Sequence, residues 1–222
     1  CAFCGMYRDR SFRRSTLEEA SALIAKSARG NSEARRVFLA DGDVMARPFE
    51  DLSAIIGMLR KAFPSLARVN VYATGTAIAA KTDEQLASLR EGRLHTLYMG
   101  LESGDEETLR RCCKAESASL MVSAGLRAHA RGLHMSVMVL LGLGGKERTS
   151  EHAKATASAL NLMKPKLLSF LRVIPVPGTG LQAEIDKGAF IQLTEFETIQ
   201  ELRALVLGLE LERTVFRANH SS

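Results

Sequence analysis

The apolar residues of this chain fall into short continuous runs that alternate with longer amphipathic stretches. The run 135–141 is apolar except for Ser136, which is typical of a strand buried on both faces. Stretches with apolar residues every three or four positions indicate helices between the runs. This pattern predicts strands over 36–40, 68–73, 96–101, 135–141 and 167–174, and helices over 16–29, 48–63, 83–90, 106–131 (broken near 116–117), 149–163 and 194–212.

Five strands that alternate with helices predict parallel βαβ units with right-handed crossovers. An open doubly wound sheet and a full or partial barrel both satisfy this alternation. Ligands bind at the carboxyl ends of parallel strands, and in a barrel the whole rim faces one site. We expect a barrel because polar and glycine residues follow all five predicted strands, in the segments 41–43, 74–75, 102–104, 142–145 and 175–178.

Length and composition narrow the class of protein. A chain of 222 residues, 46% of them hydrophobic, is long enough to bury a core without disulfides or a structural metal. Its longest apolar stretch, 135–143, is well short of the roughly 18 residues that a membrane span requires, so we expect no membrane association. The net charge of +5 points only weakly to an anionic partner. Aromatic residues make up 5% of the chain and Trp is absent, so a nucleic-acid partner is not supported.

Four arginines cluster within seven positions near the start of the chain: Arg8, Arg10, Arg13 and Arg14. Such a cluster can bind an anion, but a solvated loop and helix entry is the more common arrangement. We therefore interpret these arginines as solvated.

The chain opens with Cys1-Ala2-Phe3-Cys4 and has four cysteines in all. Two thiolates at this spacing can hold a metal or a cluster, or act as a redox pair. The other two, Cys112 and Cys113, are adjacent and point about 100° apart on a helix, so we interpret them as small buried residues. With no signal peptide visible, a secreted disulfide framework is not expected, and a reducing cytoplasm fits best.

Five further motifs follow this CxxC at the spacing of successive βα units: 39–43 (LADGD), 71–74 (VYAT), 98–103 (YMGLES), 137–145 (VMVLLGLGG) and 174–179 (IPVPGT). In this order, the set resembles the core domain of radical S-adenosylmethionine (SAM) enzymes, in the branch that contains methylthiotransferases and oxygen-independent coproporphyrinogen oxidases. The resemblance covers residues 1–180 and implies an α/β fold, a partial (β/α)6 TIM-like barrel. Residues 181–222 are then expected to form a C-terminal helical extension of the same domain.

The resemblance also implies two cofactors, a [4Fe-4S] cluster and SAM. In that family a CxxxCxxC loop after the first strand gives three thiolates to the cluster and leaves one iron open for SAM. Cys1 and Cys4 match the last two of these cysteines. We therefore expect the first cysteine and the first barrel strand to lie upstream of Cys1, outside this sequence.

The remaining motifs imply contacts with SAM, each weighed against a plainer role. Phe3 and Leu140 match positions beside the adenine, and Tyr72 a position that binds the ribose in some relatives. Gly42 and Asp43 match the strand end whose backbone carbonyls accept hydrogen bonds from the SAM amino group, although such glycines also occur in ordinary turns. The set is completed by Glu102, which matches a cofactor-binding acid but could be a helix N-cap neighbour, and by Lys114, which matches a carboxylate-binding base but could be a solvated helix residue.

These features predict a radical SAM enzyme that cleaves SAM reductively to a 5′-deoxyadenosyl radical, which abstracts hydrogen from an unknown substrate. An electron donor of the flavodoxin or ferredoxin type is implied. The five histidines lie at predicted strand starts, helix faces or the terminus, so we expect no catalytic or zinc-binding histidine site. Residues 181–222 lack auxiliary-cluster cysteines and are too short for an RNA-binding barrel, which disfavours a methylthiotransferase. Two alternatives stay open: a cluster-, SAM- or haem-binding chaperone-like relative without turnover, and a thiol-redox or zinc protein that uses only Cys1 and Cys4.

Overall fold

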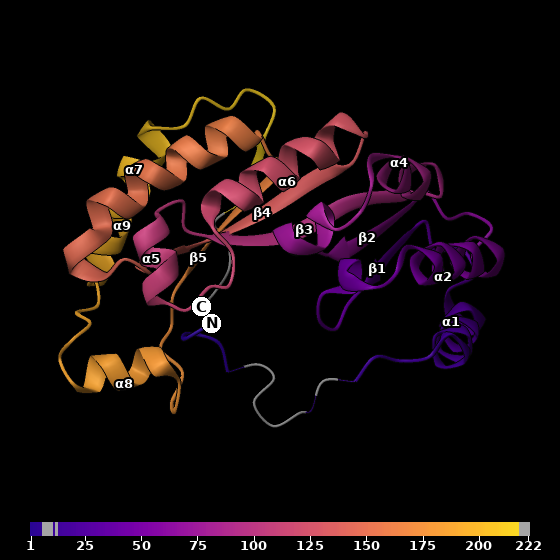
Figure 1. The fold of residues 1–222 in the computed structure, drawn as a ribbon, viewed down its shortest axis with the longest axis horizontal. Helices are drawn as coiled ribbons and strands as arrows, with labels where there is room; N and C mark the ends of the chain where they lie inside the picture. The colour runs from indigo at the N-terminus through magenta and orange to yellow at the C-terminus, as the bar shows by residue number, and fades with distance from the viewer. Residues whose placement is uncertain (6–10, 12, 218–222) are drawn as a thin grey trace. The chain divides into compact units, whose positions relative to one another are not determined.

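The computed structural model describes residues 1–5, 11 and 13–217. Figure 1 shows how its strands and helices alternate along the chain. The strands are β1 (Arg36–Leu39), β2 (Arg68–Tyr72), β3 (Leu94–Glu102), β4 (His134–Leu141), β5 (Leu167–Arg172) and β6 (Val215–Arg217). The helices are α1 (Leu17–Asn31), α2 (Phe49–Ala62), α3 (Gly75–Ala79), α4 (Asp83–Glu91), α5 (Glu106–Arg111), α6 (Ala118–Ala130), α7 (Gly145–Met163), α8 (Gly180–Asp186) and α9 (Glu195–Leu207), with a 3₁₀ turn η1 (Val44–Ala46).

The six strands form one parallel sheet in chain order, β1-β2-β3-β4-β5-β6, and over the described residues this sheet does not close. The predicted α/β class with parallel βαβ units is therefore confirmed. In the register of the sheet, Tyr72 pairs with Tyr98 and Val139 pairs with Phe170. Because the strands are parallel and in chain order, their carboxyl ends share one edge of the sheet.

The predicted elements appear in the structure in the predicted order, but their ends differ and some elements were missed. The break predicted near 116–117 is real, because α5 and α6 are separate helices. Two short helices were missed, α3 and α8, each capped by a threonine hydroxyl, from Thr74 and Thr179 respectively. The three-residue strand β6 was also missed, and the last helix, predicted to reach residue 212, ends at Leu207.

The chain divides into two compact units. The first unit comprises Cys1–Ser11, Gly100–Ser123 and Ser136–Ser222, and the second comprises Phe12–Met99 and Ala124–Met135. The predicted division between a core over 1–180 and an extension over 181–222 stays a prediction. In the first unit the core includes Leu101, Val137, Val139, Leu160, Leu168 and Leu205, and in the second it includes Leu52, Leu59, Val69, Val71, Leu86 and Leu97.

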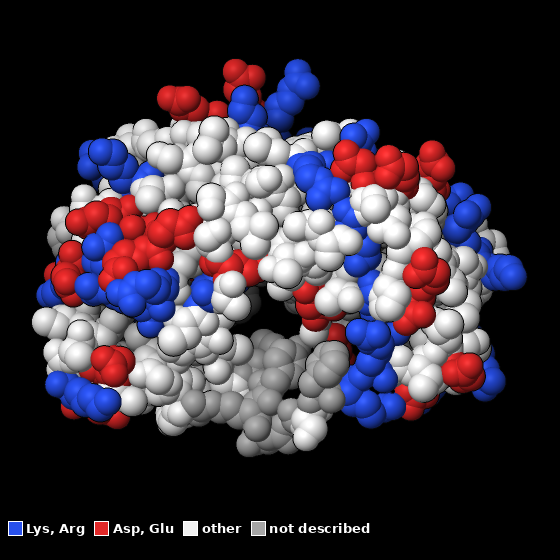
Figure 2. All heavy atoms as spheres, in the orientation of Figure 1, with Lys and Arg blue, Asp and Glu red and all other residues white. Residues whose placement is uncertain are grey.

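Charged side chains of both signs are interspersed on the face shown in Figure 2. Arg13 pairs with Glu19 and is largely exposed, and Arg14 is also exposed, which agrees with the solvated interpretation of these two arginines. Arg8 and Arg10 lie outside the described residues. Exposed ion pairs of this kind contribute about 0–1 kcal/mol each to the free energy of unfolding. No helix of the described chain is both long and apolar enough to cross a membrane.

Candidate functional site

Strand β3 ends in a tight turn centred on Glu102. The N–H of Ser103 donates to the carbonyl of Leu101 at 2.7 Å, and the φ of Glu102 is 62°. A hydrogen bond from residue i+2 to residue i around a positive φ defines a γ-turn of the strained form, which is rare for a residue other than glycine. Strained backbone of this kind is concentrated at functional sites and persists only where its surroundings hold it.

The side chain of Glu102 folds back over Gly100. A Cβ added at Gly100 would overlap Glu102 Oε1 and lie 2.9 Å from its Cδ, so the space above residue 100 is needed for the carboxyl group. Lys114 Nζ donates to the Gly100 carbonyl at 2.6 Å and lies 3.7 Å from Glu102 Oε1. The two side chains are only 12% and 15% exposed. Burial raises the pKa of Glu102, and the ammonium group of Lys114 partly opposes that rise.

The position of Lys114 corrects one of the sequence interpretations. The alternative of a solvated helix residue is wrong, because α5 ends at Arg111 and Lys114 lies in the loop after it with its ammonium directed at Gly100. Cys113 corrects another interpretation: it adopts a left-handed conformation with φ 54° and is exposed rather than buried. Only Cys112 of that pair is a buried residue, as predicted.

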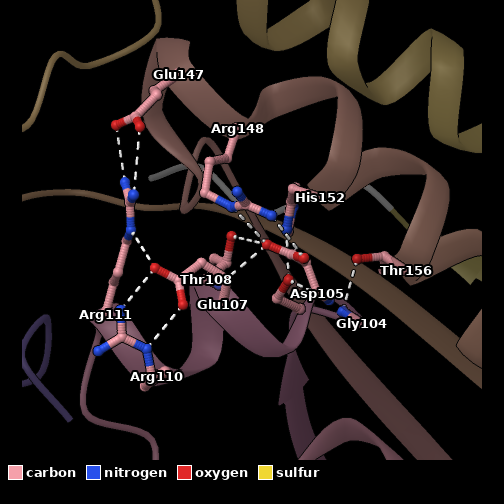
Figure 3. Close-up of polar contacts among 11 residues, drawn as sticks. Gly104, Asp105, Glu107, Thr108, Arg110, Arg111, Glu147, Arg148, His152 and Thr156 are labelled. Atoms are coloured by element: carbon pink, nitrogen blue, oxygen red, sulfur yellow. Dashed lines mark hydrogen bonds and ion pairs between the residues drawn. The ribbon is translucent and has the colours of Figure 1, made fainter.

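Helix α7 supports the segment that follows Glu102. The Gly104 N–H donates to Thr156 Oγ1 at 2.8 Å. A Cβ at Gly104 would overlap the carbonyl oxygen of Ala155 and lie 2.6 Å from the Thr156 Cα, so only glycine lets the turn approach the helix backbone this closely. Figure 3 shows this contact beside the charged groups of α5 and α7.

Asp105 joins α5 to α7 in the same region. Its carboxylate caps α5 through the Thr108 N–H at 3.0 Å and binds Arg148 with both oxygens, at 2.9 and 3.0 Å (Figure 3). Burial opposes ionisation of Asp105, but the hydrogen bonds from Arg148 and Thr108 outweigh it and lower its pKa to about 2. Asp105 is therefore ionised throughout the physiological range and anchors the turn to α7.

The loop that carries Cys1 and Cys4 is tied to other segments of the first unit by its backbone. The Ala2 N–H donates to the Cys112 carbonyl at 2.7 Å, and the Ala2 carbonyl accepts the Leu181 N–H at 2.9 Å. Both cysteines are exposed and form no disulfide. The loop thus lies against the end of α5 and the start of α8 with its two thiols accessible.

Phe3 and Leu140 pack against one hydrophobic cluster, which comprises Cys112, Leu143, Val173 and Leu181. Burial raises the pKa of the Cys112 thiol, which also experiences the charges of Lys114 and Glu102. Six of the predicted site residues therefore belong to the first unit and are linked through the segment 100–114: Cys1, Phe3, Cys4, Glu102, Lys114 and Leu140.

The other three predicted site residues, Gly42, Asp43 and Tyr72, belong to the second unit. Asp41 and Gly42 have φ values of 68° and 78°, so the turn after β1 has two successive left-handed residues. Thr74 donates its hydroxyl to Asp43 Oδ2 at 2.5 Å, which joins the ends of β1 and β2.

Tyr72 lies in an aromatic group on the same unit. Its ring centroid is 4.9 Å from that of Phe38 and 6.4 Å from that of Tyr98, in edge-to-face arrangements. Its side chain is partly exposed and presents a phenol, in place of the carboxylate that some relatives have at this position.

The described donor set fits part of a cluster site. Cys1 and Cys4 supply two accessible thiols on one loop, the ligand type that iron–sulfur clusters use. Among the described residues, no group of three or more His, Cys, Asp or Glu side chains could hold a metal ion. Cys1 and Cys4 thus have the chemistry and accessibility of two cluster ligands.

The sequence interpretation missed a buried histidine next to the Glu102 turn. His152 Nδ1 hydrogen-bonds to Ser103 Oγ at 2.8 Å, and its Nε2 lies 3.7 Å from Glu201 Oε1. The prediction placed His152 on a helix face, which is correct, but spacing alone did not associate it with residues 49 positions apart. His95 and His134 lie at the amino ends of β3 and β4, as predicted.

Comparisons with known proteins identify the family of this chain. The family model of the radical SAM superfamily matches residues 1–158. A search of curated proteins found no match.

Solved structures show the same fold at low sequence identity. Methylornithine synthase (PylB) superposes with a TM-score of 0.67 at 17% identity, over 97% of this chain and 59% of that one. Coproporphyrinogen III oxidase (HemN) from Escherichia coli gives 0.69 at 13%, over 93% and 48%. Elp3 from Methanocaldococcus infernus gives 0.67 at 14%, over 93% and 53%.

The chain thus spans about half to three-fifths of the length of these structures. Their likeness confirms the predicted partial TIM-like barrel. The superfamily in general uses SAM and a [4Fe-4S] cluster. With 158 of 222 residues matched by the family model, the chain belongs to the radical SAM superfamily of enzymes.

Proposed function

We propose that this chain is the catalytic core of a radical SAM enzyme in which Cys1 and Cys4 bind two irons of a [4Fe-4S] cluster. The observation that carries this proposal is the segment 100–114. It bears the strained Glu102 turn, it holds Lys114 against Gly100, and its Cys112 carbonyl binds the backbone between the two cysteines. One short segment thereby connects the thiol loop to the proposed SAM-binding side chains.

The bound cluster and SAM would supply an electron and a 5′-deoxyadenosyl radical that abstracts hydrogen from the substrate. The protein's own residues would bind SAM and orient it. The ammonium group of Lys114 suits the SAM carboxylate, and Glu102 is an acceptor for cofactor hydroxyl or amino groups. Phe3 and Leu140 offer apolar surface for the adenine, and the two belong to one hydrophobic cluster.

The family resemblance also assigns three residues of the second unit to SAM. Backbone carbonyls at Gly42 and Asp43 are proposed to accept hydrogen bonds from the SAM amino group. Tyr72 is proposed to lie beside the ribose, where its phenol can donate or accept a hydrogen bond. The two left-handed residues of this turn support the proposal, since they turn the backbone sharply at the strand end.

An electron donor of the flavodoxin or ferredoxin type and a cytoplasmic location are part of the same proposal. Reduction of a low-potential cluster requires such a donor, and free exposed thiols are kept reduced in the cytoplasm. A nucleic-acid substrate is not part of it.

The test is anaerobic reconstitution of the full-length protein with iron and sulfide, followed by reduction in the presence of SAM. We expect about four irons per chain and release of 5′-deoxyadenosine. Cys4→Ser should lower the iron content, whereas Cys113→Ser, an exposed cysteine on another loop, should leave it unchanged. Equal iron content in the two variants would contradict the assignment of Cys4, as would a natural chain without a cysteine four residues before Cys1.

Glu102→Ala tests the SAM site separately from the cluster. Loss of a hydrogen bond to a charged group corresponds to about 1.5–3 kcal/mol. We therefore expect the dissociation constant for SAM to rise roughly tenfold to hundredfold in this variant, at unchanged iron content. Glu147→Ala, a largely exposed carboxylate on α7, is the matched control. Unchanged SAM affinity in Glu102→Ala would refute the role of this residue.

A further inference from the structure

A chain of buried polar side chains leads from α9 to the turn at the end of β3, within the first unit. Glu201 Oε1 accepts the N–H of Gly142 at 2.6 Å, and its Oε2 accepts the hydroxyl of Thr149 at 2.5 Å. His152 Nε2 lies 3.7 Å from Glu201 Oε1, and His152 Nδ1 hydrogen-bonds to Ser103 Oγ at 2.8 Å. The chain therefore connects α9, α7 and the ends of two neighbouring strands.

The order serine, histidine, glutamate is that of a nucleophilic triad, but the burial excludes such a role here. Ser103 and His152 are 0% exposed and Glu201 is 3% exposed, so no substrate reaches the serine oxygen. That oxygen also accepts the N–H of Asp105 at 3.0 Å. Ser103 Oγ, His152 Nδ1 and both Glu201 oxygens have hydrogen-bond partners within this group or on the backbone, whereas His152 Nε2 has none and only lies near Glu201 Oε1. A buried, substrate-free arrangement of this kind is a structural polar network.

Both ends of this chain are turns with left-handed backbone. Gly142 has φ 79° and follows Leu140 by two residues at the end of β4. Ser103 follows Glu102, whose φ is 62°. Left-handed conformations such as that of Glu102 persist only where contacts from elsewhere hold them, and here the contacts come from His152 and Glu201.

We propose that Glu201 is a positioning residue for the SAM site. Its carboxyl group holds the turn after β4 directly, by the hydrogen bond to Gly142. It also packs 3.7 Å from His152 Nε2, and the other ring nitrogen of His152 bonds to Ser103 beside the Glu102 turn. This inference rests on the proposed function, because it concerns SAM binding at Glu102 and Leu140. Helix α9 lies beyond residues 1–158, so the site depends on a helix outside the segment that the family model matches.

Truncation of Glu201 should weaken SAM binding although Glu201 itself does not contact SAM. Glu201→Ala removes the acceptor of the Gly142 N–H and of the Thr149 hydroxyl. Because a buried donor without a partner is unfavourable, we expect the turn at Gly142 to move so that its N–H can bind water. Supporting residues of this kind change ligand affinity by about tenfold to a hundredfold when they are removed. We expect a loss of SAM affinity in this range for Glu201→Ala. Glu201→Gln keeps an acceptor oxygen for Gly142 and should stay within about threefold of the wild type.

The matched control is Leu205→Ala. Leu205 is fully buried on the same helix, so its truncation destabilises the fold without touching the polar chain. Gln200→Ala, at an exposed position next to Glu201, should change neither stability nor affinity. A purely structural role for Glu201 predicts that Glu201→Ala and Leu205→Ala bind SAM alike.

The experiment measures two quantities on the full-length protein. The first is the dissociation constant for SAM, by equilibrium dialysis of the anaerobically reconstituted protein. The second is backbone amide exchange in residues 100–105 and 140–146, by mass spectrometry without SAM. Glu201→Ala should weaken SAM binding and speed exchange in both segments, with Leu205→Ala as reference. Ser103→Ala removes the bond to His152 and the acceptor of the Asp105 N–H, and it should speed exchange in 100–105 alone. This variant replaces Glu201→Ala if that variant does not fold.

Two results would overturn the proposal: SAM affinity of Glu201→Ala within threefold of Leu205→Ala, or unchanged exchange in both segments. If the wild-type protein binds no SAM, the proposed function fails, and the exchange measurement alone then decides the positioning role of Glu201.

Discussion

Gly100 and Gly104 flank Glu102, and the same substitution at these two positions should have different consequences. A Cβ at Gly104 meets backbone, since it would overlap the Ala155 carbonyl and lie 2.6 Å from the Thr156 Cα. A Cβ at Gly100 meets only the carboxyl end of the Glu102 side chain. Gly104→Ala should therefore separate the turn from α7, whereas Gly100→Ala should displace a carboxyl group.

The magnitudes follow from these contacts. Overpacking against a rigid neighbour costs about 1–3 kcal/mol, and loss of the Gly104 N–H bond to Thr156 adds about 0.5–1.5 kcal/mol. Gly104→Ala should thus lower the free energy of unfolding by about 2–4 kcal/mol. Gly100→Ala forces Glu102 off its rotamer at about 0.5–1.5 kcal/mol, partly offset by the entropy that alanine saves in the unfolded chain. Its net effect on stability should be under about 1 kcal/mol.

Equilibrium denaturation with urea measures both effects, and a SAM titration of the reconstituted protein completes the comparison. Gly100→Ala should lose SAM affinity to about the same extent as Glu102→Ala while it stays folded. Equal losses of stability in the two glycine variants would refute the reasoning, as would wild-type SAM affinity in Gly100→Ala.

Three further predictions concern ionisable groups of the first unit. Burial lowers the pKa of His152 to about 4, so below its unfolded pKa of about 6.5 the unfolded chain binds a proton that the folded chain does not. The free energy of unfolding should therefore fall by up to about 3 kcal/mol as the pH drops from 6.5 to 4. Urea unfolding should show less of this loss in His152→Asn. Arg148→Ala removes two hydrogen bonds to Asp105, so the pKa of Asp105 should rise from about 2 and the free energy of unfolding should fall by about 2 kcal/mol. A change below about 0.5 kcal/mol in urea unfolding would contradict the importance of this pair. Lys114→Met removes the cation beside Glu102, so the pKa of Glu102 should rise further. SAM titrations of this variant between pH 6 and 8 should show weaker binding. Wild-type binding across that range would argue against Lys114 as a SAM ligand.

Much of the fold was predictable because its signals are local. The apolar run that becomes β4 is a strand in the structure, since a continuous apolar stretch of this length is typical of a strand covered on both faces. The short helices α3 and α8 were not predictable from periodicity, because five to seven residues hold too few turns to show it.

The candidate site, like the fold, was predictable from the sequence only in part. The order of the strand-end motifs identified the superfamily from sequence, because it reflects a parallel topology in which each strand end reaches the same edge. Exposure of Cys113 and burial of Lys114 were not predictable, since both depend on where α5 ends and on a left-handed residue that no short motif specifies.

The sequence by itself determined the alternation of strands and helices, the superfamily and the residues proposed to meet SAM. Only the tertiary structure decided which distant groups hold those residues in place. Ser103, His152 and Glu201 are separated by tens of positions, and Gly104 reaches α7 across a comparable interval. Such contacts depend on how helices pack on a sheet, and packing is a property of the folded chain that no local pattern of residues contains.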